Sequence, residues 1–573
     1  MAVTIRVARP APARRAHQRG ALVALAHTRL MMLMLLFAAA VLLVIGRLAM
    51  LAAFGPAEAR SSVATLAARG DITDRNGEPL ARTIDAWTIA VHPRQIMGDK
   101  MELAARLAAL MPDRGDQAWF YGQLTKDVSF TYLQQRASPQ LVEQVNALGE
   151  PALVFARETQ RLYPQSTLAA HALGYLSVDG HGMSGMERVL DGRLLDPRNK
   201  GAPVALSIDT RVQAAMESEL MRAKNTFSAR AAAGLVLDVH TGEIIAMVSL
   251  PTFNPNRVGM SGLDELRNAT TQNVYELGST FKPITMATAI DTGVVTDMSR
   301  RFDATAPLHV GGFTIHDEAG DPKRWLNIPE TLIYSSNVAT ARVADLLGPE
   351  RLQATFRKLG FDTKPEIELR EKGRPLWPTY WARTTTMTTA YGHGIAITPL
   401  QLANAYATLV NGGIWRPTTL LKVGPGHPAP AGRRAISEAT SARMRQLLRL
   451  IVLKGTGRKA DAPGYRIAGK TGTAEAAAAG GYDRSRNVAT FVAAFPIDSP
   501  RYVVLSMLDG PQGTKETGGW KTAAWNAAPV VGRVVARVGA LLGVTPDANR
   551  DIDESDLLPL LWQDPSEKVA DAR

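Results

Sequence analysis

Ser279 and Lys282 form the only Ser-x-x-Lys spacing in the chain. The chain has no cysteine, and its ten histidines show no metal-ligand spacing, so serine, threonine and lysine are the available nucleophiles. If a helix begins near Gly278, the two side chains lie on one face, about 5 to 6 Å apart between Cβ atoms. A lysine whose pKa is lowered by burial could then take the serine proton, which is the chemistry of nucleophilic catalysis. On its own the spacing also fits a capping serine followed by a surface lysine.

Two further segments could complete such a site. Ser335–Asn337 begins 56 residues after Ser279 and follows the apolar stretch 332–334, so we expect it at a turn or a helix start. Lys470–Thr473 begins 191 residues after Ser279, in a segment typical of a strand. A glycine in a strand lets another segment approach closely, and a lysine with neighbouring hydroxyls is suited to bind a carboxylate. In this order, the three segments indicate a serine acyl-transfer site more strongly than any one of them alone.

The segments around these residues predict an α+β domain over residues 230–545. Apolar runs at 234–238 and 243–248 are typical of a β-hairpin, and three more strand-like runs follow at 466–473, 490–495 and 501–508. A mainly helical region separates the two groups of strands, with helices expected at 400–409 and 438–453, and another helix is expected at 529–542. We therefore predict a five-stranded antiparallel sheet that is split by a helical insert.

The residues on either side of this domain differ from it in composition. Residues 60–222 mix short alternating stretches, such as 87–91, with a helix expected at 101–111, and predict a separate module. Residues 547–573 hold eight acidic against three basic residues, so we interpret 546–573 as an acidic C-terminal tail that is mobile and solvated. We find no internal repeat in the chain.

The N-terminal segment accounts for much of the positive charge. The net charge is +12, yet six arginines and no acid lie within the first 29 residues. The apolar run 30–54, interrupted by Arg47, is long enough for one transmembrane helix at about 1.5 Å per residue. The positive-inside rule places the basic tail 1–29 in the cytoplasm and the chain after about residue 56 across the membrane. A cleaved signal peptide is the alternative, because 57–59 resembles a cleavage site.

Composition and the position of the charges argue against two kinds of protein, a polytopic transporter and a nucleic-acid-binding protein. Charged residues make up 21% of the chain, which excludes a polytopic transporter. Arginines beside an apolar helix are explained by membrane topology, and no aromatic residues are interleaved with them. We therefore expect no nucleic-acid partner, although the overall charge is basic.

The three segments together resemble the S-x-x-K, S-x-N and K-T-G set of penicillin-binding proteins and serine β-lactamases. Arg69–Glu78 resembles the R-G-x-I-x-D-R-N-G opening of class B penicillin-binding proteins, and the same family is matched at 171–175, 182–187, 391–394 and 398–402. The segment 335–338 resembles that of the division-type, FtsI-like members. Two residues depart from the family pattern: Leu277 stands where proline is usual, and Ala339 stands where division types often have glycine.

The resemblance implies a penicillin-binding protein and serine β-lactamase-like transpeptidase domain, preceded by a pedestal of the dimerisation type over 60–222 and one transmembrane helix at 30–54. It implies a peptidoglycan D,D-transpeptidase that crosslinks stem peptides of the septal wall through a serine acyl-enzyme, is inhibited by β-lactams and needs no cofactor or metal. The catalytic residues that it implies are Ser279 as nucleophile, Lys282 as base, Ser335 as proton relay, Asn337 as a hydrogen-bond partner of the donor amide and of Lys282, and Lys470 as a source of positive field. The substrate-binding residues that it implies are Thr471, Gly472 and Thr473, with the backbone N–H groups of Ser279 and Thr473 as the oxyanion hole.

The same resemblance implies a location and partners. We expect a single-pass protein of the bacterial inner membrane at the division septum, with the bulk of the chain in the periplasm. Its substrates would be peptidoglycan stem peptides and lipid II-derived strands, and its protein partners a glycosyltransferase of the SEDS family and other divisome membrane proteins. An elongation-type transpeptidase, a β-lactamase, and a catalytically silent scaffold or β-lactam sensor stay open as alternatives.

Overall fold

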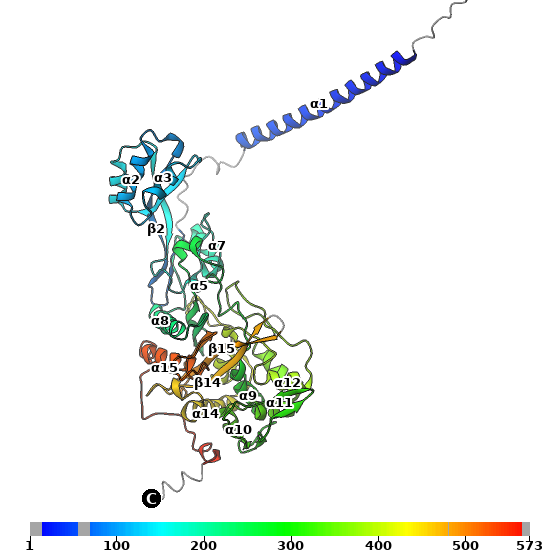
Figure 1. The fold of residues 1–573 in the computed structure, drawn as a ribbon, viewed down its shortest axis with the longest axis vertical. Helices are drawn as coiled ribbons and strands as arrows, with labels where there is room; N and C mark the ends of the chain where they lie inside the picture. Colours follow the sequence, from blue (N-terminus) through cyan, green and yellow to red (C-terminus); the bar gives the residue numbers. More distant parts are fainter. Residues whose placement is uncertain (1–13, 55–68, 479–480, 564–573) are drawn as a thin grey trace, which may run out of the picture. The chain divides into compact units, whose positions relative to one another are not determined.

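The computed structural model describes residues 14–54, 69–478 and 481–563, and divides the chain into two compact units, Met1–Leu66 and Ala67–Arg573. The first unit is described by α1 (Arg14–Phe54), whose stretch Thr28–Arg47 is long and apolar enough to cross a membrane (Figure 1). The helix begins well before the apolar run because the preceding residues are mostly good helix formers. Residues 1–13 of the expected tail, and the possible cleavage site at 57–59, lie outside the described residues.

The first part of the larger unit is a sheet with small helices around it. The strands are β1 (Ile72–Thr73), β2 (Pro79–Val91), β3 (Thr131–Ala137), β4 (Leu153–Leu162) and β5 (Val204–Ala205). Their order is β3-β2-β1-β5, and β4 also pairs with β2. The accompanying helices are α2 (Lys100–Leu110), α3 (Gln117–Leu124), α4 (Pro139–Asn146), α5 (Ala170–Leu173), α6 (Gly185–Val189) and α7 (Asp191–Leu195), with short 3-10 turns η2 (Pro93–Gln95) and η3 (Pro197–Asn199).

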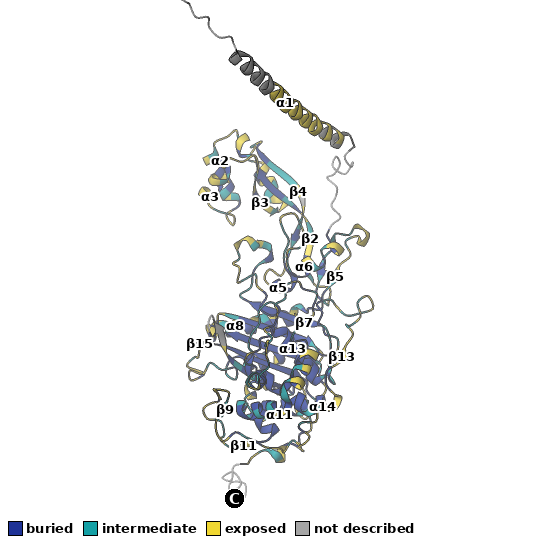
Figure 2. Ribbon diagram, turned by 90° about the vertical axis from the view of Figure 1, so that its right-hand side faces the viewer, coloured by how far each residue is buried: buried dark blue, intermediate teal, exposed yellow. Residues whose placement is uncertain are grey.

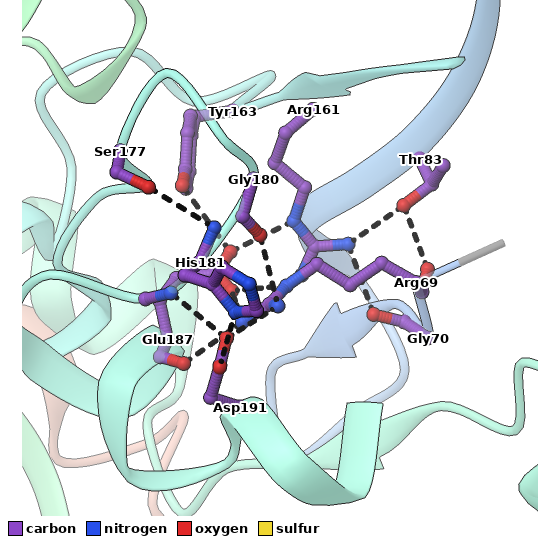
Figure 3. Close-up of polar contacts among 11 residues, drawn as sticks. Arg69, Gly70, Thr83, Arg161, Tyr163, Ser177, Gly180, His181, Glu187 and Asp191 are labelled. Carbon is purple, nitrogen blue, oxygen red and sulfur yellow. Dashed lines mark hydrogen bonds and ion pairs between the residues drawn. The ribbon is translucent and has the colours of Figure 1, made fainter. Parts of the chain in front are cut away.

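A buried ion cluster holds this sheet to α6 and α7 (Figure 3). The Glu187 carboxylate is fully buried and accepts from Arg69 Nε at 2.9 Å, Arg161 Nε at 2.7 Å and the Tyr163 hydroxyl at 3.2 Å. A second carboxylate, that of Asp191, also binds Arg69, at 2.7 Å. Buried charges are tolerated when they are paired in this way. Two of the family-like segments of the sequence, which begin at Arg69 and end at Glu187, therefore meet in space.

Figure 1 shows a second sheet in the later part of the larger unit, among α8 (Thr210–Thr226), α9 (Lys282–Asp291), α14 (Glu438–Lys454) and α15 (Ala527–Val538). It contains β6 (Ala231–Asp238), β7 (Ile244–Leu250), β14 (Ala468–Ala478), β15 (Gly481–Phe495) and β16 (Tyr502–Asp509), in the order β14-β15-β16-β6-β7. All neighbouring strands are antiparallel. The prediction of a five-stranded antiparallel sheet is confirmed.

Both faces of this sheet are covered, as its mostly buried strands show (Figure 2). Alternate residues of β16 enter two different cores, because successive side chains of a strand point to opposite faces. Val504 and Leu508 pack with α8 (Thr210–Thr226) and α15 (Ala527–Val538), while Leu505 packs with α13 (Pro399–Val410) and the helical insert. Helix α15 ends four residues before the expected end at 542.

The predicted helical insert lies between β7 and β14. Its main helices are α9 (Lys282–Asp291), α10 (Ile328–Ile333), α11 (Asn337–Lys358), α12 (Arg383–Thr389), α13 and α14 (Glu438–Lys454). Its shorter elements are η4 (Pro255–Met260), η5 (Gly278–Phe281), β8 (Phe302–Asp303), β9 (Leu308–Val310), β10 (Phe313–Ile315), β11 (Trp325–Leu326), β12 (Ile414–Trp415), β13 (Arg433–Arg434) and η6 (Arg458–Ala460). Capping boxes begin α10 at Asn327 and α13 at Thr398, and fix where these helices start.

The segment after α15 contacts the catalytic part of the chain at several positions. Leu557 is only 1% exposed, the Asp551 carboxylate pairs with Arg449 of α14 at 2.6 Å, and η7 (Leu558–Leu560) follows. The expectation of a free tail is therefore wrong for the docked part of 547–562, where Glu554 and Leu557 are buried, although most residues of this segment are exposed to solvent, as expected. The acidic composition hid apolar contacts and a buried arginine partner that lies about 100 residues earlier in the chain. Residues 564–573 lie outside the described part of the chain.

Candidate active site

Ser279 lies in a tight turn that leads into a buried helix. The turn is η5, and α9 follows it directly, so Ser279 stands at the start of a helix as the sequence predicts. The buried hydroxyl of Tyr406, in α13, donates a hydrogen bond to the Thr280 carbonyl at 2.8 Å and so fixes the position of the turn. The Ser279 side chain is half-buried, whereas Lys282, three residues later, is fully buried.

The Ser335 hydroxyl joins two lysines from distant parts of the chain. Lys282 Nζ lies 3.1 Å from Ser335 Oγ and also donates to the Ser335 carbonyl, while Lys470 Nζ lies 2.9 Å from the same hydroxyl. Ser335 sits between α10 and α11 with a φ of 61°, a left-handed conformation that few non-glycine residues adopt. The three segments singled out in the sequence thus meet at one oxygen atom.

Burial controls the charge of the two lysines. Desolvation lowers the pKa of Lys282 to about 7, although Asp317, Asp321 and Glu318 oppose this shift. Burial, followed by the nearby charge of Lys282, lowers the pKa of Lys470 well below its usual range. Two ammonium groups on one buried hydroxyl repel each other, so near neutral pH at least one amine is unprotonated. The site therefore contains an amine that can accept a proton, three residues after Ser279 in the chain.

Asn337 does not contact Lys282 in the way that the resemblance implies. Its side-chain amide donates to the His316 carbonyl at 2.9 Å, and the hydrogen bonds of Lys282 go to Ser335 instead. Ser336 caps α11 and donates its hydroxyl to Asp317 at 2.7 Å, and Asp317 also accepts from a backbone N–H at the start of that helix.

The loop after β10 that carries Asp317 was not identified from the sequence. The only local signal is a group of acids that follows a short apolar strand, and such groups are common on solvated surfaces.

The strand β14 carries the remaining predicted residues and lies against the turn of Ser279. A Cβ atom on Gly472 would stand 2.4 Å from the Leu277 carbonyl oxygen, and one on Gly278 would stand 2.8 Å from the Thr473 carbonyl oxygen. Only glycine allows this close approach. Leu277, which replaces the usual proline, is buried with 1% exposure and supplies a carbonyl to the turn.

The hydroxyls of β14 have fixed partners. Thr471 Oγ1 lies 2.7 Å from Thr456 Oγ1 and 3.3 Å from Lys470 Nζ. Thr473 is half-buried, and its Oγ1 accepts from the backbone N–H of Ala523 at 3.1 Å. Because each hydroxyl is held by the protein, both are pre-oriented for a polar ligand along the free edge of the sheet.

One segment that the sequence matched only as a motif also reaches the site. A Cβ on Gly392 would stand 2.3 Å from the Gly278 carbonyl oxygen, and the N–H of Gly394 donates to Glu276 at 3.1 Å. His393 between them is half-buried, and its pKa is lowered by desolvation and by the charge of Lys282. The segment 392–394 therefore packs against one side of the turn that carries Ser279.

The chain resembles known proteins over most of its length. Residues 232–530 match the family described as penicillin binding protein transpeptidase domain, and residues 64–194 match the penicillin-binding protein dimerisation domain. The probable peptidoglycan D,D-transpeptidase FtsI of Caulobacter vibrioides is 41% identical over 495 residues, which are 83% of this chain and 82% of that protein. The chain is a class B penicillin-binding protein.

Further relatives of this penicillin-binding protein, compared by sequence and by structure, belong to the same family. The peptidoglycan D,D-transpeptidase FtsI of Escherichia coli K12 is 30% identical over 528 residues, which are 86% of each chain. Crystal structures of penicillin binding protein 3 from Mycobacterium tuberculosis superpose with TM-scores of 0.65 with aztreonam and 0.66 with ampicillin, at 27% identity over 84% of this chain and 97% of that one. Among the described residues of this penicillin-binding protein, no group of three or more His, Asp or Glu could hold a metal ion.

Proposed function

We propose that this penicillin-binding protein is a D,D-transpeptidase that crosslinks peptidoglycan stem peptides through an acyl-enzyme on Ser279. The observation that supports this most directly is the Ser335 hydroxyl, which lies within 3.1 Å of the amines of both Lys282 and Lys470 beside the nucleophile turn. A nucleophile at a helix start, a buried amine and a bridging hydroxyl are the parts that serine acyl transfer requires.

In the first half of the reaction, Ser279 Oγ attacks the carbonyl carbon of the penultimate D-Ala. Lys282, neutral because its pKa is lowered to about 7, takes the Ser279 proton. The new C–O bond forms and the peptide C–N bond breaks. The proton passes through the Ser335 hydroxyl to the amine of the departing D-Ala.

In the second half, the amine of a neighbouring stem peptide attacks the ester carbon. The amine loses a proton to Lys282, the C–O bond of the ester breaks, and Ser279 Oγ recovers a proton. The product is a 4-3 type peptide crosslink. Water as the acceptor would give hydrolysis instead, which is the β-lactamase outcome.

The other predicted residues bind the donor. Thr471 and Thr473 hold its terminal carboxylate or the carboxylate of a β-lactam, Gly472 leaves room for the turn against β14, and Lys470 adds positive charge when it is protonated. Asn337, held by the His316 carbonyl, hydrogen-bonds the donor amide. The backbone N–H groups of Ser279 and Thr473 form the oxyanion hole, and the loss of one such donor costs about 10²- to 10³-fold in rate.

The relatives named FtsI, together with one apolar N-terminal helix, support a division enzyme anchored in the inner membrane. The basic tail 1–29 lies in the cytoplasm, the anchor spans 30–54, and the pedestal 60–222, the catalytic domain 230–545 and the segment 546–573 lie in the periplasm. We infer that the protein acts at the septum with a SEDS-family glycosyltransferase and other divisome membrane proteins on lipid II-derived strands.

Two experiments test these proposals. Purified protein incubated with stem-peptide substrates should release D-Ala and form dimers linked by a 4-3 bond, detected by mass spectrometry, whereas release without dimers would indicate hydrolysis. Depletion in cells should give filaments if the enzyme serves division. Rounded cells would show instead that it serves elongation. Normal division in cells whose only copy is Ser279→Ala would support a catalytically silent scaffold.

A further inference from the structure

The C-terminal segment 547–562, here named the strap, packs on the catalytic part of the chain and takes no part in the reaction described above. Its first anchor is Asp551. Both carboxylate oxygens of Asp551 bind Arg449 of α14, at 2.9 and 3.1 Å from Nε and at 2.6 Å from Nη2. Arg449 is only 5% exposed and pairs with two carboxylates, so the strap supplies one of the two counter-charges of a buried cation.

The same guanidinium holds the start of β14. Arg449 Nη1 donates to the Ile467 carbonyl at 2.8 Å and to Asp461 at 2.8 Å. Ile467 is the residue before β14 and lies three positions before Lys470. The guanidinium is rigid and planar. Asp551, which binds Nε and Nη2, therefore also fixes the direction in which Nη1 donates to the Ile467 carbonyl.

The second anchor of the strap holds the start of α10. The Leu560 carbonyl accepts from Asn327 Nδ2 at 2.7 Å, and the Trp562 N–H donates to Glu330 at 2.8 Å. Asn327 and Glu330 are each 1% exposed and form the capping box of α10. This helix ends two residues before Ser335.

Contacts along the strap join the two anchors. Leu557 is 1% exposed and belongs to the main hydrophobic core. Gln446 of α14 donates to the Asp553 carbonyl at 2.7 Å, and Arg443 pairs with Asp556 at 2.5 Å. The Trp562 ring lies 5.2 Å from the Arg324 guanidinium, which lies 5.5 Å from the ring of Tyr334, the neighbour of Ser335.

We propose that the strap is a positioning element for acyl transfer, and that Asp551 and Trp562 act through the elements that carry Lys470 and Ser335. The strap thereby connects the start of β14 to the start of α10. The 2.9 Å contact between Lys470 Nζ and Ser335 Oγ depends on how these two elements are aligned. This inference rests on the proposed acyl-transfer function. A misplacement of about 1 Å in such a site costs on the order of 100-fold in rate.

The test compares the wild-type protein, purified in detergent with its membrane helix, with two point variants and one C-terminal truncation. Asp551→Asn removes the charge at the first anchor and keeps an oxygen acceptor. A stop after Leu557 removes the second anchor and leaves Asp551 and the buried leucine in place. Glu219→Gln is the control for a general loss of stability, because this buried carboxylate pairs with arginines away from the site: Arg222 at 3.3 Å, Arg533 at 2.7 Å and Arg537 at 2.9 Å, between α8 and α15.

The readout is stopped-flow acylation by a fluorescent penicillin over a range of concentrations, which separates the dissociation constant of the first complex from the rate constant of acylation. We expect both strap variants to lower the acylation rate constant about tenfold or more, with an unchanged dissociation constant. We expect Glu219→Gln to lower the unfolding temperature without changing either constant of the folded protein.

Wild-type acylation rate constants in both strap variants would overturn the inference, as would an equal loss in Glu219→Gln, which would reveal a general effect of stability. These outcomes differ from failure of the proposed function, because in that case the wild-type protein would not be acylated at all. If the truncated chain does not fold, Asp551→Asn alone is decisive: a lowered acylation rate constant supports the inference and a wild-type rate constant overturns it.

Discussion

Replacement of Gly472 by alanine should separate the two halves of the active site without unfolding the protein. A Cβ atom at this position would stand 2.4 Å from the Leu277 carbonyl oxygen, 2.7 Å from Thr280 Cγ2 and 3.1 Å from the Thr280 nitrogen. Two of these three atoms belong to the backbone of the turn that carries Ser279, so no side-chain rotation can relieve the clash.

The size of the effect follows from these distances. A Cβ atom approaches its neighbours no closer than 3.0 Å, so β14 must retreat from the turn by about 0.6 Å. A displacement of about 1 Å costs on the order of 100-fold in an oriented reaction, so we expect Gly472→Ala to lower acylation about tenfold to a hundredfold. This equals about 1.4 to 2.8 kcal/mol of transition-state stabilisation.

The assay is the time course of labelling by a fluorescent penicillin, followed on denaturing gels and normalised to the folded fraction from circular dichroism. Gly122→Ala is the control, because Gly122 lies in the exposed helix α3 and an added Cβ atom there would meet no other atom within 4 Å. This control should acylate normally and gain up to about 1 kcal/mol of stability. Acylation of Gly472→Ala at the wild-type rate would refute the close approach of β14 to the nucleophile turn.

Three further predictions concern protons, the bridging hydroxyl and the first sheet. The pKa of Lys282 is lowered to about 7 and its neutral form is the base, so acylation should rise with pH through about 7 and fall about tenfold per unit below it; a flat profile from pH 5 to 9 would contradict this. Ser335→Ala removes the shared contact of two lysines and should slow acylation about 10²-fold or more in the same labelling assay. Glu187→Gln leaves Arg161 buried without a counter-charge and leaves Arg69 with Asp191 alone, and should lower the free energy of unfolding by about 3 to 5 kcal/mol in urea titrations; an unchanged midpoint would show that the ion cluster contributes little.

The sequence predicted the elements whose signals are local. The five strands of the catalytic sheet were predicted because each has a run of apolar residues. The helix start near Ser279 was predicted from Gly278 and the helix formers that follow, whereas 335–337 was expected only at a turn or a helix start, because it follows an apolar stretch. The strands β14 and β15 are longer than expected, since they continue as a hairpin through polar residues such as Glu475 and Asn487. Cross-strand pairing, and not apolar composition, defines that part of the sheet.

Features that depend on distant contacts could not be predicted in this way. Asp317 becomes important only because α11 begins beside it, and Gly392 only because it meets the carbonyl of Gly278. The contacts of the strap were not predicted because five of its sixteen residues are acidic, whereas its partners Arg449 and Asn327 lie more than 100 residues away. A single sequence carries no signal for such pairs.

The central claim is that Ser279 is the nucleophile of this site. Its most direct measurement is peptide mapping by mass spectrometry after the full-length protein has reacted with penicillin. We predict one stable adduct, on Ser279, that is absent from a folded Ser279→Ala variant. An adduct on any other residue, or labelling that persists in Ser279→Ala, would contradict the claim.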